Sequence, residues 1–291
     1  MHSMKDAFSR FHPAVNFAYF ALVLGFTMRF VHPVCQVISL ACAFAYSIFL
    51  RGARAARMNL LGLLPLIAVT ALLNPLFSHQ GVTILAYLPG GNPLTAESVL
   101  YGLSAGVVLA AALSWFCCVN EIMTSDKFVY LFGRFAPSLA LLLSMTLRFV
   151  PRFTRQMRSA AAFRAASGGA PGKRDAAAAL SGVAGWAMEN AVETADSMKS
   201  RGWGLGGRTA YSIYRFERRD AAAAIFMAAD SAFILCAKFA GALGFRYYPS
   251  VRGSLDGLSY FAFAAYAALC LAPLAVDILE EAGWKALRSQ N

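Results

Sequence analysis

The residues best suited to a specific interaction with a partner are Ser200, Arg201 and Gly202, which end a run of helix-forming residues. A glycine directly after Arg201 is typical of a helix C-cap, because glycine adopts the left-handed backbone without steric cost. An arginine in this place can direct its planar guanidinium away from its own domain, toward carboxylates of a partner. The simpler interpretation, in which Arg201 only complements the dipole of its own helix, stays open.

The helix that ends at Arg201 has two distinct faces. Glu189, Glu193 and Asp196 fall at i, i+4 and i+7, so a helix places the three carboxylates on one face. A second face carries small or flexible apolar side chains that let another helix approach closely. These residues are Ala184, Ala187, Ala191, Ala195 and Met198. A glycine-rich basic turn that includes Arg208 follows the helix.

A row of four arginines precedes this helix in the chain. Arg148, Arg152, Arg155 and Arg158 recur at spacings of four, three and three residues, which is one helix face. Pro151 lies in the same stretch and predicts a kink. The row suits two partners equally, the anionic headgroups of lipids or the acidic surface of a protein.

Other kinds of site find no support in the residue pattern. The six cysteines all lie in apolar segments and the four histidines are scattered, so neither metal-ligand spacing nor a catalytic triad is present in the sequence. The sequence has no G-x-x-x-x-G-K-[ST] motif, so the chain is not expected to hydrolyse ATP by itself. We therefore expect a non-catalytic chain that binds no metal or cofactor of its own.

The composition predicts an all-α, polytopic membrane protein. Hydrophobic residues make up 58% of the 291 residues and charged residues 14%, whereas soluble domains carry about 25% charged residues. About six transmembrane helices are expected, and the first two runs are short for a bilayer crossing of about 20 residues. The apolar runs are 14–28, 34–50, 60–77, 99–119, 221–245 and 258–276.

The positive charge is concentrated in one part of the chain. Residues 148–219 hold thirteen Lys or Arg and five Asp or Glu, which is +8 of the net +11. Nucleic-acid binding is one explanation, but cytoplasmic positive charge on a membrane protein explains the block better. We therefore predict a membrane domain of about four spans at 1–119, a cytoplasmic helical domain at 120–220, and two more spans with a short tail at 221–291.

Three helices are predicted in the cytoplasmic domain. The first begins at Ser125 or Asp126 and ends near Phe135, the second opens at Pro137, and the third covers 176–200. The two long helices, one with an arginine face and one with a carboxylate face, suggest a crossed pair. Small residues are expected near the crossing, namely Ser181, Gly182, Gly185 and Ala187.

Several short motifs, spread over nearly the whole chain, resemble one protein family. They are Asn74-Pro-Leu-Phe77, Gly81-x-Thr83-x-Leu85, Asn92-x-Leu-Thr-x-Glu97-Ser, Tyr101-Gly102, Arg148-Phe-x-Pro151, Ala195-Asp-Ser-Met-Lys-Ser-Arg-Gly-Trp-Gly and Gly207-Arg208-Thr209. In this combination the chain resembles the transmembrane T component of energy-coupling factor (ECF) transporters. These are vitamin and metal-ion importers of the ATP-binding cassette class.

The resemblance assigns a role to the two helix ends. Family members carry two Ala-Arg-Gly motifs, one at the end of each long coupling helix. The second corresponds to Ser200-Arg201-Gly202, with serine in place of alanine. The first falls near Ala166-Ser167-Gly168, where serine replaces the arginine, and Arg164 one turn earlier is a candidate substitute. The resemblance gives supporting roles along the coupling helices to Arg148, Pro151, Glu189, Glu193, Asp196 and Arg208.

The resemblance also implies partners and a location. Two ATPase subunits would use ATP and Mg and would each take one coupling-helix end in a groove. The crossed helices would pass the ATPase motion to a small membrane-embedded substrate-binding subunit, the S component, which releases a vitamin or transition-metal ion inside. The chain would be a multi-pass protein of the bacterial cell membrane with both termini cytoplasmic, surrounded by the lipid bilayer and binding no nucleic acid.

Three other functions stay open on the sequence. A self-contained secondary transporter would depend on Asp230 and Lys238, which lie inside a predicted span, but no internal repeat accompanies them. A membrane-bound enzyme, such as a lipid-modifying transferase, would need clustered His, Asp or Glu at the membrane interface, and the sequence offers none. A membrane anchor of a cytoplasmic complex differs from the ECF function only in whether ATP turnover is coupled to transport.

Overall fold

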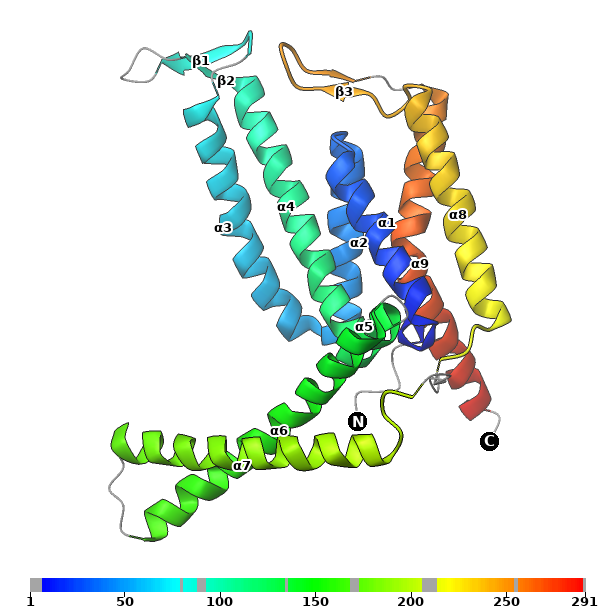
Figure 1. Ribbon diagram of the computed structural model, residues 1–291. Coiled ribbons are helices and arrows are strands. Elements are labelled where there is room, and N and C mark those ends of the chain that lie inside the picture. Colours follow the sequence, from blue (N-terminus) through cyan, green and yellow to red (C-terminus); the bar gives the residue numbers. More distant parts are fainter. Residues whose placement is uncertain are drawn as a thin grey trace. The chain divides into compact units, whose positions relative to one another are not determined.

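The computed structural model describes residues 7–78, 81–87, 93–133, 136–167, 173–205, 214–253 and 256–289, and these residues are almost wholly helical (Figure 1). The chain forms two compact units. Residues 1–124 and 214–291 form the first, which we name the bundle unit, and residues 125–213 form the second, the insert unit.

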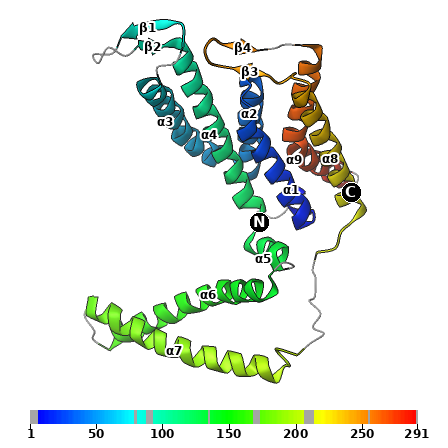
Figure 2. The same cartoon turned by 45° about the horizontal axis from the view of Figure 1, so that its top comes forward.

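Six helices within the described residues build the bundle unit (Figures 1 and 2). Helix α4 packs against α1, α2 and α3, and helix α9 packs against α2 and α8. The bounds are α1 (Pro13–Arg29), α2 (Pro33–Arg51), α3 (Ala53–Phe77), α4 (Ala96–Ile122), α8 (Arg218–Phe239) and α9 (Gly257–Ser289). Two short antiparallel ladders, β1 (Ile84–Tyr87) with β2 (Pro93–Thr95) and β3 (Phe245–Arg246) with β4 (Arg252–Gly253), connect helices at one end of the bundle.

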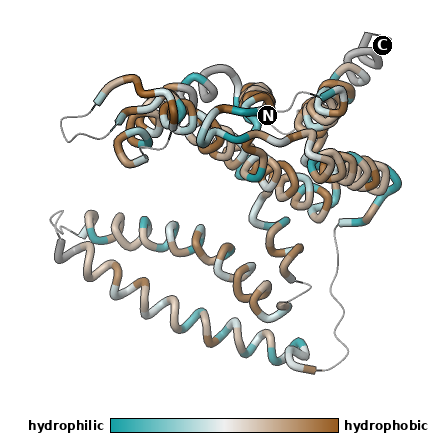
Figure 3. Tube along the Cα trace, turned by 90° about the horizontal axis from the view of Figure 1, so that it is seen from above, coloured by the Kyte–Doolittle hydropathy of each residue, from teal (hydrophilic) through white to brown (hydrophobic). Residues whose placement is uncertain are grey.

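Four of these helices are long and apolar enough to cross a membrane, namely α2, α4, α8 and residues Gly257–Gly283 of α9. The apolar stretch of α3 is the shorter segment Leu61–Phe77, and α1 has 17 residues. Figure 3 shows hydrophobic residues along most of the bundle helices and a mixture along the helices of the insert unit. The chain is therefore an all-α membrane protein, as its composition predicts.

Proline, histidine and glycine set the helix limits that the sequence predicts. Pro13 and Pro33 occupy first-turn positions, where their missing N–H costs nothing. His12 and His32 precede them, and the Nδ1 atom of each accepts the N–H two residues later, at 3.2 and 3.3 Å. Gly52, with φ of 82°, ends α2.

One predicted limit is wrong. The fifth apolar run was expected to remain helical to Phe245, but α8 ends at Phe239. Gly241 adopts φ of 87°, and the Ala242 N–H bonds to the Ala237 carbonyl at 3.1 Å, which is the Schellman arrangement of a helix end. Phe245 lies instead in β3.

Buried hydroxyls and an indole fix the centre of the bundle. The Ser39 Oγ accepts the Trp115 Nε1–H at 3.0 Å and lies 2.7 Å from the Thr27 Oγ1, which is in turn 3.1 Å from the Tyr266 hydroxyl. These four residues come from α2, α4, α1 and α9, and all are fully buried. Because a buried polar group without a partner is costly, this network specifies how the four helices pack.

A very close contact joins α3 and α4. At Gly102, an added Cβ atom would lie 2.9 Å from the Thr70 carbonyl oxygen and 2.9 Å from the Asn74 Cβ. Gly106, one turn later, faces Ile67 and Thr70 at similarly short range. Glycine is required at both positions because any larger residue would separate the helices.

Hydrogen bonds close the end of this helix pair beside β1 and β2. The Asn74 amide donates to the Ser98 carbonyl at 2.8 Å, and the Ser98 hydroxyl donates to the Ser78 carbonyl at 2.7 Å. The Glu97 carboxylate accepts the Thr83 hydroxyl at 2.9 Å and the Thr83 N–H at 3.2 Å. Many motif residues from 74 to 102 thus have a structural task in tying α3 to α4.

Two carboxylates fasten the N-terminal segment at the opposite end of the bundle. Asp277 of α9 accepts the Phe8 N–H at 2.8 Å. Asp220, in the first turn of α8, accepts the His12 N–H at 3.1 Å and the Glu217 N–H at 2.9 Å. The Glu217 contact is half of a capping box, because the Glu217 side chain also accepts a backbone N–H of α8.

The described part of the insert unit holds three helices, at positions close to those predicted. They are α5 (Ser125–Gly133), α6 (Pro137–Ala166) and α7 (Lys173–Ser200). Helix α6 packs against both α5 and α7. It runs as one 30-residue helix through Pro151.

Candidate functional site

Helices α6 and α7 cross in the insert unit, as predicted, and the contact is apolar (Figures 1 and 2). The Phe153 ring stands edge-on to the Trp186 ring, with 5.7 Å between centroids. Ala179 and Val183 of α7 are buried. A shallow groove of about 500 Å³ lies along the crossing, with Met157 on its α6 side and Leu180 on its α7 side.

The small residues expected at the crossing are mostly elsewhere. Ser181, Gly182 and Gly185 are exposed, and an added Cβ at either glycine would meet nothing within 4 Å. Ala187 does line the groove. The prediction was wrong for the other three because the 3.6-residue period turns Leu180, Val183 and Ala187 toward α6 and leaves the two glycines on the opposite side.

The side chains of both charged rows are exposed. Arg148, Arg152 and Arg155 on α6 are exposed, and Arg158 is exposed at the border of the groove. On α7, Glu189, Glu193 and Asp196 are exposed. Within 136–167 and 173–205, no ion pair joins the two rows. The arginine row of α6 and the carboxylate row of α7 are therefore both available to groups outside the insert unit.

The C-terminal end of α7 has the geometry that the sequence predicts. Gly202 adopts φ of 83°, the Gly202 N–H bonds to the Lys199 carbonyl at 3.0 Å, and the Trp203 N–H bonds to the Met198 carbonyl at 3.0 Å. This pair of bonds is a Schellman motif, which satisfies carbonyls that the helix end leaves unpaired. The Ser200 hydroxyl donates to the Ser197 carbonyl at 2.9 Å, and the Arg201 side chain is exposed.

The C-terminal end of α6 is less basic, and its serine bonds to the backbone of its own helix. The Ser167 hydroxyl donates to the Phe163 carbonyl at 2.9 Å, one turn back in its own helix. Arg164 is half-buried in the last turn, while Ala166 is exposed. Gly168 and Arg208, the remaining predicted site residues, lie outside the described residues. The two helix ends thus differ: α7 ends with the exposed side chain of Arg201, whereas α6 ends with Ser167, whose hydroxyl bonds to its own helix.

Apolar side chains continue along α6 beyond the crossing without a cover in the insert unit. Leu139 is 65% exposed, Leu142 61% and Val150 55%. On α7, Met188 is 74% exposed and Val192 63%. Exposed apolar surface of this extent on amphipathic helices marks a contact face for a protein or a membrane.

The charged residues of the fifth apolar run do not form a site together. Asp230 is half-buried, and the Lys238 ammonium lies 5.0 Å from the centre of the Phe30 ring in a cation–π contact. In the described ranges, no group of three His, Cys, Asp or Glu residues is placed to hold a metal ion. The features that sequence reasoning missed are the Ser39–Trp115 network and a recess beside Arg219, because both join segments that are distant in sequence.

The chain was compared with models of protein families and with curated proteins, and neither comparison finds a match.

Proposed function

We propose that this chain is the transmembrane coupling subunit of an ECF-type importer in a bacterial cell membrane. In this proposal α1, α2, α3, α4, α8 and α9 are six spans, and both termini and the insert unit are cytoplasmic. The substrate is a vitamin or a transition-metal ion held by a separate S component. The chain itself carries out no chemistry, and two partner ATPases hydrolyse ATP.

The observation that carries the proposal is the end of α7. Arg201 is exposed directly before a glycine-terminated Schellman turn, on a long helix that crosses a second long helix. A helix end of this form enters a groove as a rigid rod, and the guanidinium at its tip can form two parallel hydrogen bonds with a carboxylate. An ATPase groove lined by acidic residues is a suitable partner.

The crossing supports a role in transmitting motion. An apolar contact around Phe153 and Trp186 joins α6 to α7, and no ion pair within the described parts of the two helices adds to it. Apolar contacts lack strong directionality, so the angle between the helices can change at a small energetic cost. Closure of two ATPases, each holding one helix end, would change this angle.

The uncovered apolar side chains of α6 support the second half of the proposal. Leu139, Leu142 and Val150 lie on the side of α6 opposite to the arginine row. An S component is itself very hydrophobic and would bury this face. Because such a contact has few directional bonds, the S component could shift along it when the angle between the helices changes.

The test is a pull-down of the tagged chain in mild detergent from its native host, with Mg-ATP present and mass spectrometry of the bound proteins. We expect two ATP-binding cassette ATPases and one small, very hydrophobic membrane protein. The Arg201→Ala variant should lose the ATPases, because an unpaired interfacial charge costs roughly 2–5 kcal/mol, more than tenfold in affinity. Lys199→Ala is the matched control, since Lys199 is an exposed cation of the same last turn.

The outcomes separate the alternatives. A chain that purifies alone, without any ATPase, would contradict the proposal and make Asp230 the next residue to test for secondary transport. ATPase binding without a hydrophobic partner and without substrate uptake would favour a membrane anchor. Equal ATPase recovery by Arg201→Ala and Lys199→Ala would remove the role assigned to Arg201.

A further inference from the structure

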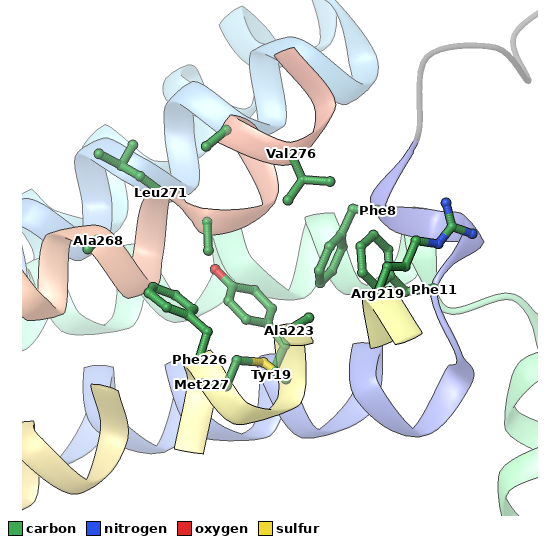
Figure 4. A pocket seen from close by; sticks show the side chains of 12 residues that line it. Phe8, Phe11, Tyr19, Arg219, Ala223, Phe226, Met227, Ala268, Leu271 and Val276 are labelled. Atoms are coloured by element: carbon green, nitrogen blue, oxygen red, sulfur yellow. The ribbon is translucent and has the colours of Figure 1, made fainter. Parts of the chain in front are cut away.

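The bundle unit contains an apolar recess of about 510 Å³ next to the N-terminal segment, which Figure 4 shows from close by. Phe8 and Phe11 close it on one side, and Phe226 of α8 and Leu271 of α9 close it on others. Its volume lies within the range of roughly 300–1,000 Å³ that small-molecule sites have.

Alanines on facing helices create the recess. Ala268, Ala272 and Ala275 of α9 follow one another at four and three residues, which is one helix face, and Ala223 of α8 lies opposite. Larger side chains at these positions would fill the space between the two helices. The alanine stripe leaves it open where α8 begins.

One charged side chain borders the recess. The Arg219 guanidinium lies over the Phe11 ring, 5.2 Å from its centre, and its nitrogen Nε is 3.4 Å from a Glu217 carboxylate oxygen. The Arg219 side chain is 47% exposed and that of Glu217 62%, so water screens this ion pair and another anion can replace Glu217 as the partner of Arg219. The Tyr19 hydroxyl, the other polar group of the lining, already donates to the Leu269 carbonyl at 3.1 Å.

Besides Glu217, two buried carboxylates at this end of the bundle are held by backbone N–H groups. Asp220 is buried and accepts N–H groups of His12 and Glu217. Asp277 is likewise buried, and its Oδ1 accepts the Phe8 N–H. Arg218, the neighbour of Arg219, is exposed and does not line the recess.

From this arrangement we infer that the recess binds a membrane phospholipid, with one acyl chain among the alanines and aromatic rings and the phosphate on Arg219. The recess lies in the first turns of α8, one of the helices long enough to cross a membrane, so its charged mouth and apolar interior match the boundary between lipid headgroups and chains. Water is a poor occupant because the lining offers it almost no hydrogen-bond partner.

The inference is independent of the proposed ECF function and is tested on the purified full-length chain. The chain is washed in mild detergent and titrated with dioleoyl phosphatidylglycerol or with dioleoylglycerol, which has the same chains but no phosphate. Native mass spectrometry counts the bound lipid. We expect one tightly bound phosphatidylglycerol per chain and at least tenfold weaker binding of dioleoylglycerol.

Variants of the charged mouth and of the apolar interior give different results. Arg219→Gln should weaken phosphatidylglycerol binding about tenfold and abolish the preference over dioleoylglycerol, whereas Arg218→Gln, outside the recess, should keep it. Ala272→Phe should block both lipids, whereas Ala228→Phe, on an exposed part of α8 outside the recess, should bind like the unaltered chain. The melting temperature of each variant checks that it is folded.

Two results would overturn the inference. The first is Arg219→Gln binding both lipids as the unaltered chain does, which would show that the mouth does not recognise phosphate. The second is a folded Ala272→Phe variant that retains one phosphatidylglycerol, which would place the lipid elsewhere. If Ala272→Phe does not fold, the exposed Arg219→Gln substitution still decides, since it leaves the core unchanged.

Discussion

Replacing Gly102 with alanine tests the close contact between α3 and α4. The new Cβ would lie 2.9 Å from the Thr70 carbonyl oxygen and 3.1 Å from the Ala71 Cα, both backbone atoms that cannot move aside alone. Overpacking of this kind costs about 1–3 kcal/mol, while alanine gains about 0.5–1 kcal/mol over glycine in a helix interior. We expect Gly102→Ala to lower the free energy of unfolding by about 1 kcal/mol, the difference between the midpoints of these two ranges.

Gly25 supplies a matched control in the same bundle. It lies inside α1, and an added Cβ there would meet nothing within 4 Å. Gly25→Ala therefore has the propensity gain without the clash and should stabilise the chain by up to about 1 kcal/mol. The two glycine-to-alanine changes are chemically identical, so opposite signs can come only from their surroundings.

Thermal unfolding of both variants in the same detergent, followed by circular dichroism, measures the two effects. The apparent melting temperature should fall for Gly102→Ala and remain or rise for Gly25→Ala. Equal shifts in the same direction would refute the argument, because they would mean that α3 and α4 can separate at no cost.

Two further predictions concern the bundle. Ser39→Ala leaves the buried Trp115 N–H without its acceptor, so we expect a loss of about 1–3 kcal/mol in thermal unfolding; the double variant Ser39→Ala/Trp115→Phe should lose less than the sum of the single variants, and strict additivity would contradict the network. At His32, burial lowers the pKa of the imidazole below its usual value, so the folded chain resists protonation that the unfolded chain accepts. Stability should therefore be greatest above about pH 6.5 and fall as the pH drops from there through the lowered folded pKa; His32→Asn, which keeps a capping acceptor without titrating, should remove this part of the slope, and an unchanged slope would count against the assignment.

The helix limits follow closely from local residue chemistry. Proline at the first turn of α1, α2 and α6 and glycine after α2 and α7 act within a few residues, so the sequence alone reveals them. The end of α8 was missed because Gly241 stands in an otherwise apolar run. There the Schellman bonds, rather than polarity, end the helix.

The rotation of one helix against another could not be predicted in the same way. The period of 3.6 residues groups the arginines of α6 and the carboxylates of α7, but it does not show which face meets the other helix; both rows are exposed, and Arg158 borders the groove. Which face of α7 meets α6 depends on long-range packing of Leu180, Val183 and Trp186. The Ser39–Trp115 hydrogen bond and the Arg219 recess depend on such packing too, since each unites residues from separate helices.

The carboxylates of Asp220 and Asp277, which hold the N-terminal segment, connect several helices of the bundle unit. Residues 214–217 lead into α8. The Asp220 carboxylate accepts the N–H of Glu217, the last of these residues, and also the N–H of His12, which precedes α1. A force along residues 214–217 would therefore be shared between α1 and α8. Asp277 connects α9 to the same segment through Phe8. Asp220 and Asp277 therefore tie the N-terminal segment both to the first turn of α8 and to α9.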